Sequence, residues 1–175
     1  MLTIHGIPIS VHTRKVIVAA NEKGVAYRNE PVIPFTAPPE WAELSPTGKI
    51  PVVQAGDIVV RDSSIICQWL EREHPGHALY PKGREAWVKA LWLEEYADST
   101  LFPSVVHGLF FQKVIRPNIL KQATDADAVG QILGGNLPRV FGYLEGALEG
   151  EWLAGEGERG AAEMMGLDRS LLHGS

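Results

Sequence analysis

The sequence predicts a mixed α/β sheet in the N-terminal half of the chain and an all-helical C-terminal half. Two observations support the sheet: short apolar runs alternate with helical patterns up to Glu73, and Ser10 and Asp62 stand as helix N-caps before two of those patterns. A third observation concerns the remainder. Beyond Gly83 the strand patterns vanish and apolar residues recur at helical spacing.

The N-terminal half reads strand–helix–strand, then helix–strand–strand–helix. We predict strands at 2–5, 25–33, 51–54 and 58–60, and helices at 11–23, 40–44 and 62–73. Gly24 ends the first helix, and Ala55-Gly56-Asp57 forms a hairpin turn. The last helix presents Ile65, Ile66, Trp69 and Leu70 on one apolar face. A right-handed βαβ unit joined to a hairpin and a helix gives a four-stranded mixed sheet of thioredoxin-like type.

The C-terminal half begins after a Pro/Gly-rich linker at 74–83. Residues 84–122 are predicted to be largely helical, with a break or kink at Pro103. Residues 125–150 form a second helical stretch that Gly134-Gly135 and Pro138 should kink or split. We therefore divide the chain into a sheet domain at 1–78, a partial helical domain at 84–155 and a tail at 156–175.

Composition limits the class of protein. With 45% apolar and 21% charged residues among 175, the chain can bury a core. A net charge of -5 argues against nucleic acid or an anionic membrane as the main partner, and no apolar run reaches the roughly 18 residues of a membrane span. One cysteine cannot form an internal disulfide, so we expect a reducing, cytoplasmic setting. The six histidines show no metal-ligand spacing, and we expect no metal.

Ser10 has two interpretations. Serine is a favoured N-cap, and its hydroxyl would then accept a hydrogen bond from an N–H group one turn further along. A hydroxyl at a helix N-terminus can also donate to a thiolate, whose charge the helix dipole favours. Both interpretations use the same position, so Ser10 is the candidate catalytic residue.

Pro51 stands between a Gly-containing loop and a strand. A trans proline opening an edge strand would be the ordinary explanation. We favour a cis Ile50–Pro51 bond, which would turn the Ile50 backbone N–H and C=O outward to pair with an extended peptide.

Asp62-Ser63-Ser64 makes a good helix cap by composition alone. As a binding site, the first N–H groups of the helix and the Ser63 hydroxyl would hold a carboxylate, and Asp62 would meet an ammonium group. Lys49 is a second candidate charge contact, although a solvated lysine is the default. Cys67 lies beside the apolar face and reads as a small buried residue. No CxxC motif accompanies it, which argues against a disulfide oxidoreductase.

These segments together resemble a glutathione transferase. Residues 6–16, GIPISVHTRKV, resemble the active-serine segment of serine-type enzymes, especially the phi class and its bacterial relatives. Residues 44–53, LSPTGKIPVV, resemble the family loop N-P-x-G-x-[VI]-P, and Asp62-Ser63 matches its [ED]-S pair. Residues 92–96 and 137–145 resemble the first two helices of its helical domain.

The resemblance implies a role for each of these residues. Ser10 would activate the glutathione sulfur, Ile50 and Pro51 would hold the cysteinyl backbone, and Asp62 with Ser63 would hold the γ-glutamyl end. Glutathione would be a co-substrate, and a small hydrophobic electrophile would lie between the domains, partly against residues 96–111. The family is usually dimeric, so a homodimer is implied.

Two features depart from the family pattern. Thr36 and Ala37 stand where phi-like members often carry a basic pair, so a contact to the glycyl carboxylate is missing. The match also stops after Gly155, and the S/T-x-x-D capping box of the next helix is absent. Residues 161–172 read as a short amphipathic helix, or 156–175 are a truncated or frame-shifted end. We expect the second, with apolar surface exposed on the helical domain as a consequence.

The leading function is therefore glutathione transfer to small electrophiles, as in detoxification. The alternative is a non-catalytic binding or regulatory protein of the same fold with a weakened glutathione site. Glutathione-dependent reduction or isomerisation stays open as a third possibility, and fold does not decide among them.

Overall fold

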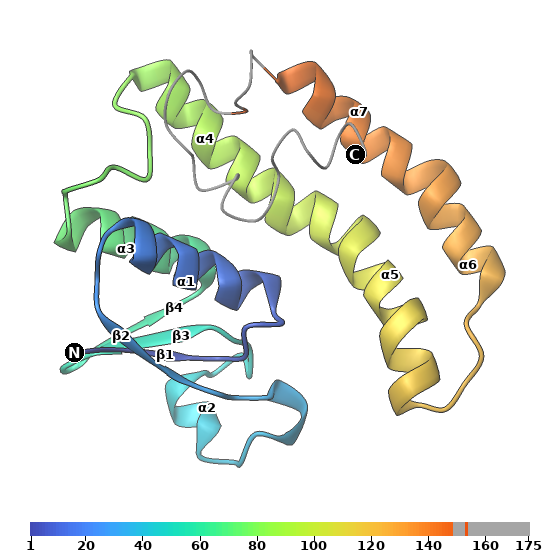
Figure 1. Ribbon diagram of the computed structural model, residues 1–175, viewed down its shortest axis with the longest axis horizontal. Helices are drawn as coiled ribbons and strands as arrows, with labels where there is room; N and C mark the ends of the chain where they lie inside the picture. The colour runs from blue at the N-terminus through green and yellow to red at the C-terminus, as the bar shows by residue number, and fades with distance from the viewer. Residues whose placement is uncertain (149–152, 154–175) are drawn as a thin grey trace.

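A computed structural model describes residues 1–148 and 153. Within them the strands β1 (Leu2–His5), β2 (Tyr27–Glu30), β3 (Val52–Ala55) and β4 (Ile58–Arg61) form one sheet in the order β2-β1-β3-β4 (Figure 1). β1 runs parallel to β2 and antiparallel to β3, and β3 runs antiparallel to β4. The predicted four-stranded mixed sheet is confirmed.

The register of the sheet brings three distant loops to one end. His5 pairs with Glu30 on one side and with Val52 on the other, and Val52 pairs with Arg61. The loop after β1, the loop before β3 and the loop after β4 therefore all leave the same end of the sheet. The β3–β4 hairpin turn lies at the opposite end, where Gly56 adopts a φ of 60°.

β2 is shorter than the predicted strand at 25–33. β1 offers only the four partners Leu2 to His5, and Pro31 directly follows the last paired residue of β2, Glu30. Proline has no N–H group to donate to a ladder, so the strand ends there. A single short helical turn at Pro34–Thr36 follows.

Two helices cover one face of the sheet. These are α1 (Val11–Glu22) and α3 (Ser63–Glu73), while the short α2 (Trp41–Leu44) lies on the other side (Figure 1). The expected apolar face of α3 needs one correction, because Ile65 is 52% exposed. Since each residue turns a helix by about 100°, the stripe made by Ile66, Cys67 and Leu70 leaves residue 65 outside.

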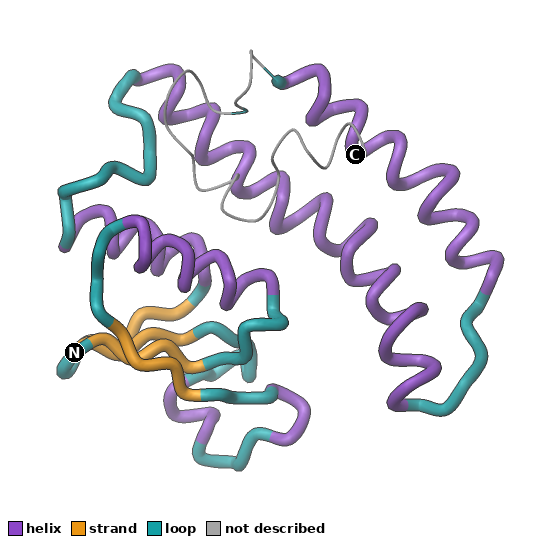
Figure 2. Tube along the Cα trace, viewed as in Figure 1, coloured by secondary structure: helices purple, strands orange, loops and turns teal. Residues whose placement is uncertain are grey.

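The helical half consists of two long rods joined by a loop (Figure 2). The first contains α4 (Arg84–Tyr96), α5 (His107–Phe110) and wide π-type turns at Ala97–Val106 and Phe111–Ile119. The second contains α6 (Ala126–Gln131), a π-type segment at Ile132–Asn136, and α7 (Leu137–Ala147). The predicted split of the second stretch is wrong, because the chain stays helical from Ala126 to Ala147; only the type of turn changes, at Ile132–Asn136, where the two glycines lie.

Of the break or kink predicted at Pro103, the break is wrong, because the chain stays helical through that residue. In the π-type turns the hydrogen bonds reach five residues back, as from the His107 N–H to the Phe102 carbonyl. A proline lacks an N–H, and a local change of helical register is a known way of accommodating such a gap.

Most of the buried apolar side chains of the described residues belong to two clusters. One lies between the sheet, α1 and α3, and also takes in Leu79, Tyr80 and Ala90. The other joins the two helical rods and includes Leu153. No helix among the described residues has the length and apolar character needed to cross a membrane. The tail at 156–175, with the helix expected at 161–172, lies outside the described residues.

Leu70→Ala tests the corrected face of α3. Leu70 is fully buried, so its truncation should lower the free energy of unfolding by about 2–5 kcal/mol. Ile65→Ala, on the same helix but exposed, should change it by no more than about 0.5 kcal/mol. Urea unfolding of both variants measures this, and equal losses would contradict the assigned face.

Candidate functional site

Ser10 is the N-cap of α1, with φ −69° and ψ 125°. Its Oγ accepts a hydrogen bond from the Thr13 N–H at 3.4 Å. The capping interpretation therefore describes the structure as it stands. Accepting this bond uses an oxygen lone pair, so the hydroxyl proton stays available for a ligand.

The start of α1 lies against the loop before β3. Gly6 has a φ of 151°, and a Cβ added there would come 2.5 Å from Thr13 Oγ1 and 3.4 Å from Ile50 Cβ. No larger residue fits this point without displacing its neighbours. Glycine at position 6 thus allows the first turn of α1 and Ile50 to approach each other.

The Ile50–Pro51 bond is cis, as predicted. The loop before it is held by side chains: Ser45 Oγ donates to the Lys49 carbonyl at 2.7 Å, and Trp41 Nε1 donates to the Gly48 carbonyl at 3.3 Å. Arg61, the last residue of β4, donates from Nε to the Leu44 carbonyl at 2.6 Å. These bonds fix the loop against the same end of the sheet.

Asp62 caps α3 from an unusual backbone conformation, with φ 72°. Its Oδ1 accepts hydrogen bonds from the N–H groups of Ser64 at 2.9 Å and Ile65 at 3.3 Å. Two N–H groups that we expected to meet a ligand carboxylate are thus already bonded. Ser63, at 4% exposure, keeps its N–H and hydroxyl as the candidate donors there.

Lys49 is exposed, and within residues 1–148 and 153 it forms no ion pair. Lys49 directly precedes the Ile50–Pro51 pair. Its exposed ammonium group can therefore contact a ligand bound at this end of the sheet. The structure accordingly attaches Ser10, Ile50-Pro51 and Asp62-Ser63 to three loops that share one end of the sheet.

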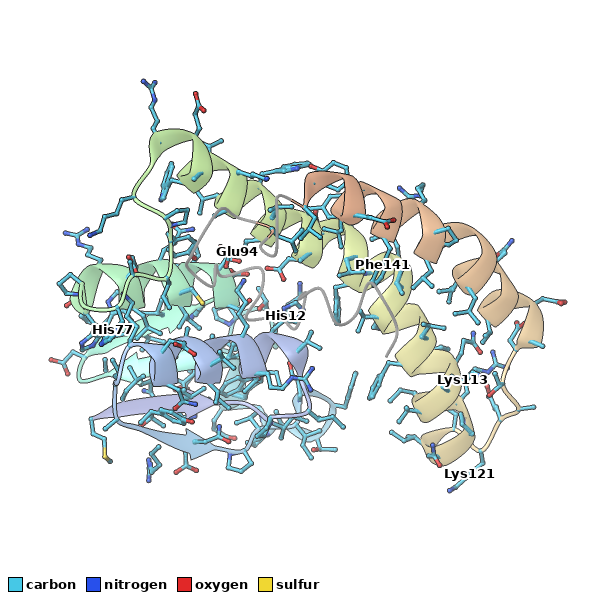
Figure 3. All side chains as sticks on the ribbon, turned by 45° about the horizontal axis from the view of Figure 1, so that its top comes forward. His12, His77, Glu94, Lys113, Lys121 and Phe141 are labelled. Atoms are coloured by element: carbon cyan, nitrogen blue, oxygen red, sulfur yellow. The ribbon has the colours of Figure 1, made fainter. Side chains whose placement is uncertain are left out.

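Sequence reasoning missed a buried ionic cluster next to this site. Lys15 is fully buried, with Nζ 2.5 Å from Glu94 Oε1 and 3.4 Å from Asp98 Oδ2. It also donates to Ser64 Oγ at 2.8 Å, and Ser64 Oγ donates to Asp98 Oδ2 at 3.0 Å. Tyr80 donates its hydroxyl to Glu94 Oε2 at 2.9 Å. The cluster joins α1 and α3 to the first helical rod (Figure 3).

The cluster stabilises the positive charge of Lys15 and the negative charge of Asp98. Burial opposes the ammonium of Lys15, but Glu94 and Asp98 outweigh it and raise the pKa of Lys15. Burial likewise opposes ionisation of Asp98, but hydrogen bonds from His12 and Ser64 and the charge of Lys15 lower its pKa. The Asp98 contribution to stability is thus present above about pH 4 and lost as pH falls through its folded-state pKa. The Lys15 contribution is present below about pH 10.5 and lost as pH rises further.

A sequence signal for this cluster existed. The buried face of α1 is made by residues at helical spacing, Lys15 among them with Val16 and Ala19. Glu94 similarly occupies the buried face of α4. A charged residue on an apolar stripe requires a partner, since burying an unpaired charge is strongly unfavourable. The positions of Lys15 and Glu94 on buried helix faces thus indicate that each has an oppositely charged partner, but they do not say which residue that partner is.

Cys67 is confirmed as a buried residue. Burial, together with the carboxylates of the nearby cluster, raises the pKa of its thiol to about 12, although Lys15 opposes the shift. The thiolate is the nucleophilic form, so this cysteine is inert at neutral pH. Among the described residues no group of three or more His, Cys, Asp or Glu side chains is placed to hold a metal ion.

A thioredoxin-like sheet with a cis proline, followed by a helical domain, defines the class of protein. Residues 4–78 match the sequence model of the glutathione S-transferase N-terminal domain. Glutathione S-transferase 3 of Zea mays is 31% identical over 161 residues, which are 89% of this chain and 71% of the maize protein. The chain belongs to the glutathione S-transferase family, and the maize relative agrees with the phi-like resemblance.

Two further proteins are similar to this chain, one over nearly its whole length and one over less than half of it. A solved structure of glutathione S-transferase III in apo form superposes with a TM-score of 0.80 at 27% identity, covering 98% of this chain and 80% of that one. A stringent starvation protein A homolog of Pasteurella multocida is 31% identical over 81 residues, 46% of this chain and 38% of that protein. Relatives of this chain thus include one that is not named a transferase.

Lys15→Met tests the ionic cluster. Removing the ammonium leaves two carboxylates without their cation, and the free energy of unfolding at pH 7 should fall by about 3–5 kcal/mol. Arg14→Met, the exposed neighbour on the same helix, should change it by no more than about 0.5 kcal/mol. Urea denaturation measures both, and a loss in Lys15→Met no larger than that in Arg14→Met would refute the assigned role.

The reactivity of Cys67 offers a separate test. Because the thiol is buried and its pKa is about 12, an aromatic disulfide reagent at pH 8 should label it no faster than the chain unfolds. Stopped-flow labelling with and without urea measures this. Rapid stoichiometric labelling of the native protein would show that the thiol is accessible and contradict the buried placement.

Proposed function

We propose that this chain binds glutathione and activates its thiol for attack on a small hydrophobic electrophile. The observation that carries the proposal is the convergence of Ser10, Ile50-Pro51 and Asp62-Ser63 on one end of the sheet. Three loops far apart in sequence supply a hydroxyl, an extended backbone segment and a helix cap to one place. That combination suits a short anionic peptide bearing a thiol.

Ser10 would stabilise the thiolate. A free thiol has a pKa near 8.5, and each unit of depression requires about 1.36 kcal/mol. A hydrogen bond from the Ser10 hydroxyl to a charged sulfur supplies about 1.5–3 kcal/mol. The dipole of α1 adds about 0.3–1 kcal/mol. These contributions lower the thiol pKa by between about one and three units, which suffices for substantial ionisation at neutral pH.

The remaining residues would fix the peptide. The backbone N–H and C=O of Ile50 would pair with the cysteinyl backbone, as an added strand does. Ser63 would donate to the γ-glutamyl carboxylate, and the exposed carboxylate of Asp62 would face its ammonium. With Thr36 and Ala37 in place of a basic pair, Lys49 would be the one cation that we propose at the glycyl end, so binding through that end should be weaker than with a basic pair.

The electrophile would lie at the seam between the sheet and the first helical rod. Phe102 from that rod packs against His12 of α1, with ring centroids 4.6 Å apart, so aromatic surface lies close to the start of α1. We extend the proposal to a cytoplasmic homodimer that acts in detoxification, since the family usually works in this way.

A second candidate function is a binding or regulatory protein with the same fold. It is favoured by the absence of the basic pair at Thr36 and Ala37 and by the similarity to a stringent starvation protein A homolog. Under this alternative the chain would retain its partner after loss of Ser10 and would not ionise a thiol.

Binding and thiol ionisation test the two functions. A dissociation constant of about 0.1 mM and 10 mM glutathione would add about 2.7 kcal/mol to stability. The melting midpoint should then rise by about 5–10 °C. Ser10→Ala should keep this shift but lose ultraviolet thiolate absorbance at pH 7.

The control is Ser99→Ala, which removes an exposed serine hydroxyl whose Oγ bonds to the Glu95 carbonyl. It should behave like the unaltered protein. No midpoint shift in the unaltered protein would reject glutathione binding. A shift without any thiolate signal, in the unaltered protein as in Ser10→Ala, would favour the binding-protein alternative.

A further inference from the structure

Ser64 is the second residue of α3 and directly follows Ser63. Its backbone N–H donates to Asp62 Oδ1 at 2.9 Å, and the same carboxylate oxygen accepts the Ile65 N–H at 3.3 Å. Both bonds end on Oδ1, so the second oxygen of this exposed carboxylate can meet a ligand ammonium. The backbone of Ser64 thus holds one of the two candidate contacts to the γ-glutamyl end and adjoins the other.

The cap at Asp62 depends on its surroundings. Its φ of 72° and ψ of 134° lie outside the regions that residues other than glycine readily adopt. Such a backbone conformation persists only where neighbouring contacts hold it. The geometry of the cap therefore depends on what fixes the first turn of α3.

The side chain of Ser64 fixes that turn from the other half of the molecule. Its Oγ accepts a hydrogen bond from Lys15 Nζ at 2.8 Å and donates its one proton to Asp98 Oδ2 at 3.0 Å. These partners lie 49 and 34 residues away in the sequence, on α1 and on the first helical rod. Lys15 is fully buried and Asp98 is 19% exposed, so Ser64 is bonded to two ionic groups that are largely removed from water.

We propose that Ser64 is a positioning residue for glutathione, which couples the helical half of the chain to the groups that bind the γ-glutamyl end. The proposal rests on the proposed function. Ser64 does not itself touch the ligand. Its hydroxyl, held by Lys15 and Asp98, fixes the directions of the Ser63 N–H and the Asp62 carboxylate, so the ligand meets groups that are already ordered. The helical half then contributes to glutathione affinity as well as to the electrophile pocket.

Ser64→Ala tests this role, because it removes the hydroxyl and leaves the ion pairs of Lys15 with Glu94 and Asp98 in place. The dissociation constant for glutathione, measured by calorimetry, should rise about three- to tenfold, the range of one ordinary hydrogen bond. With 1-chloro-2,4-dinitrobenzene as the probe electrophile, kcat at saturating glutathione should change by less than about twofold.

Substitutions at the same position and at the far end of the cluster serve as controls. Ser64→Thr keeps the hydroxyl and should bind glutathione within about twofold of the unaltered protein, whereas Ser64→Cys, a weak donor of similar size, should weaken binding as Ser64→Ala does. Tyr80→Phe removes a hydroxyl that donates to Glu94 Oε2 at 2.9 Å and not to Ser64. Its dissociation constant should stay within about twofold of the unaltered value, even if its melting midpoint falls. Thermal melts establish that each variant is folded.

An unchanged dissociation constant in Ser64→Ala and Ser64→Cys would overturn the proposal. An equal rise in Tyr80→Phe would overturn it as well, since the cluster would then act on affinity only through overall stability. A rise in Ser64→Thr as large as that in Ser64→Ala would show that the hydroxyl is not the cause. If the unaltered protein does not bind glutathione in calorimetry, the proposed function itself fails and this proposal with it. The two failures are distinct, because the unaltered protein is measured before any variant is compared.

Discussion

The contact of the buried Lys15 ammonium with Glu94 and Asp98 is the interaction on which the rest of the structure depends. It joins the helix that carries Ser10 to the helical half of the chain, across a sequence separation of 83 residues in the case of Asp98. Taking three charges out of water is unfavourable unless each is paired and hydrogen-bonded. The Lys15 ammonium meets both carboxylates only when α1 packs against the first helical rod, so the cluster ties the position of α1 to that of the helical half.

The sheet supplies the second constraint. Its register is set by pairing that runs from Glu30 through His5 and Val52 to Arg61, so three loops are bound to leave at one end. A one-residue slip would invert every side chain of a strand, and the buried face of the sheet opposes this. The candidate site is thus built on loops whose positions are determined by the core. The contact between α1 and the first helical rod, which the ionic cluster forms, lies next to this candidate site.

Much of this arrangement could be predicted from sequence because its signals are local. The N-caps at Ser10 and Asp62 and the Gly-containing loop before Pro51 each fall within a few residues. The ionic cluster could not, since Lys15 meets its partners only after the two halves pack. The break expected at Pro103 does not occur, because the wider helical turns at Ala97–Val106 accommodate the missing N–H group, which the sequence does not reveal. Ile65 was misplaced because adjacent apolar residues do not fix the angle of a buried stripe.

The central claim is that glutathione binds at the end of the sheet where the loops of Ser10, Ile50 and Ser63 meet. Backbone amide NMR during a glutathione titration tests it most directly. The account predicts chemical-shift changes concentrated at these residues and their neighbours, with none at Gly56 and Asp57 in the hairpin turn at the opposite end. Changes centred on that turn, or no changes at millimolar glutathione, would contradict it.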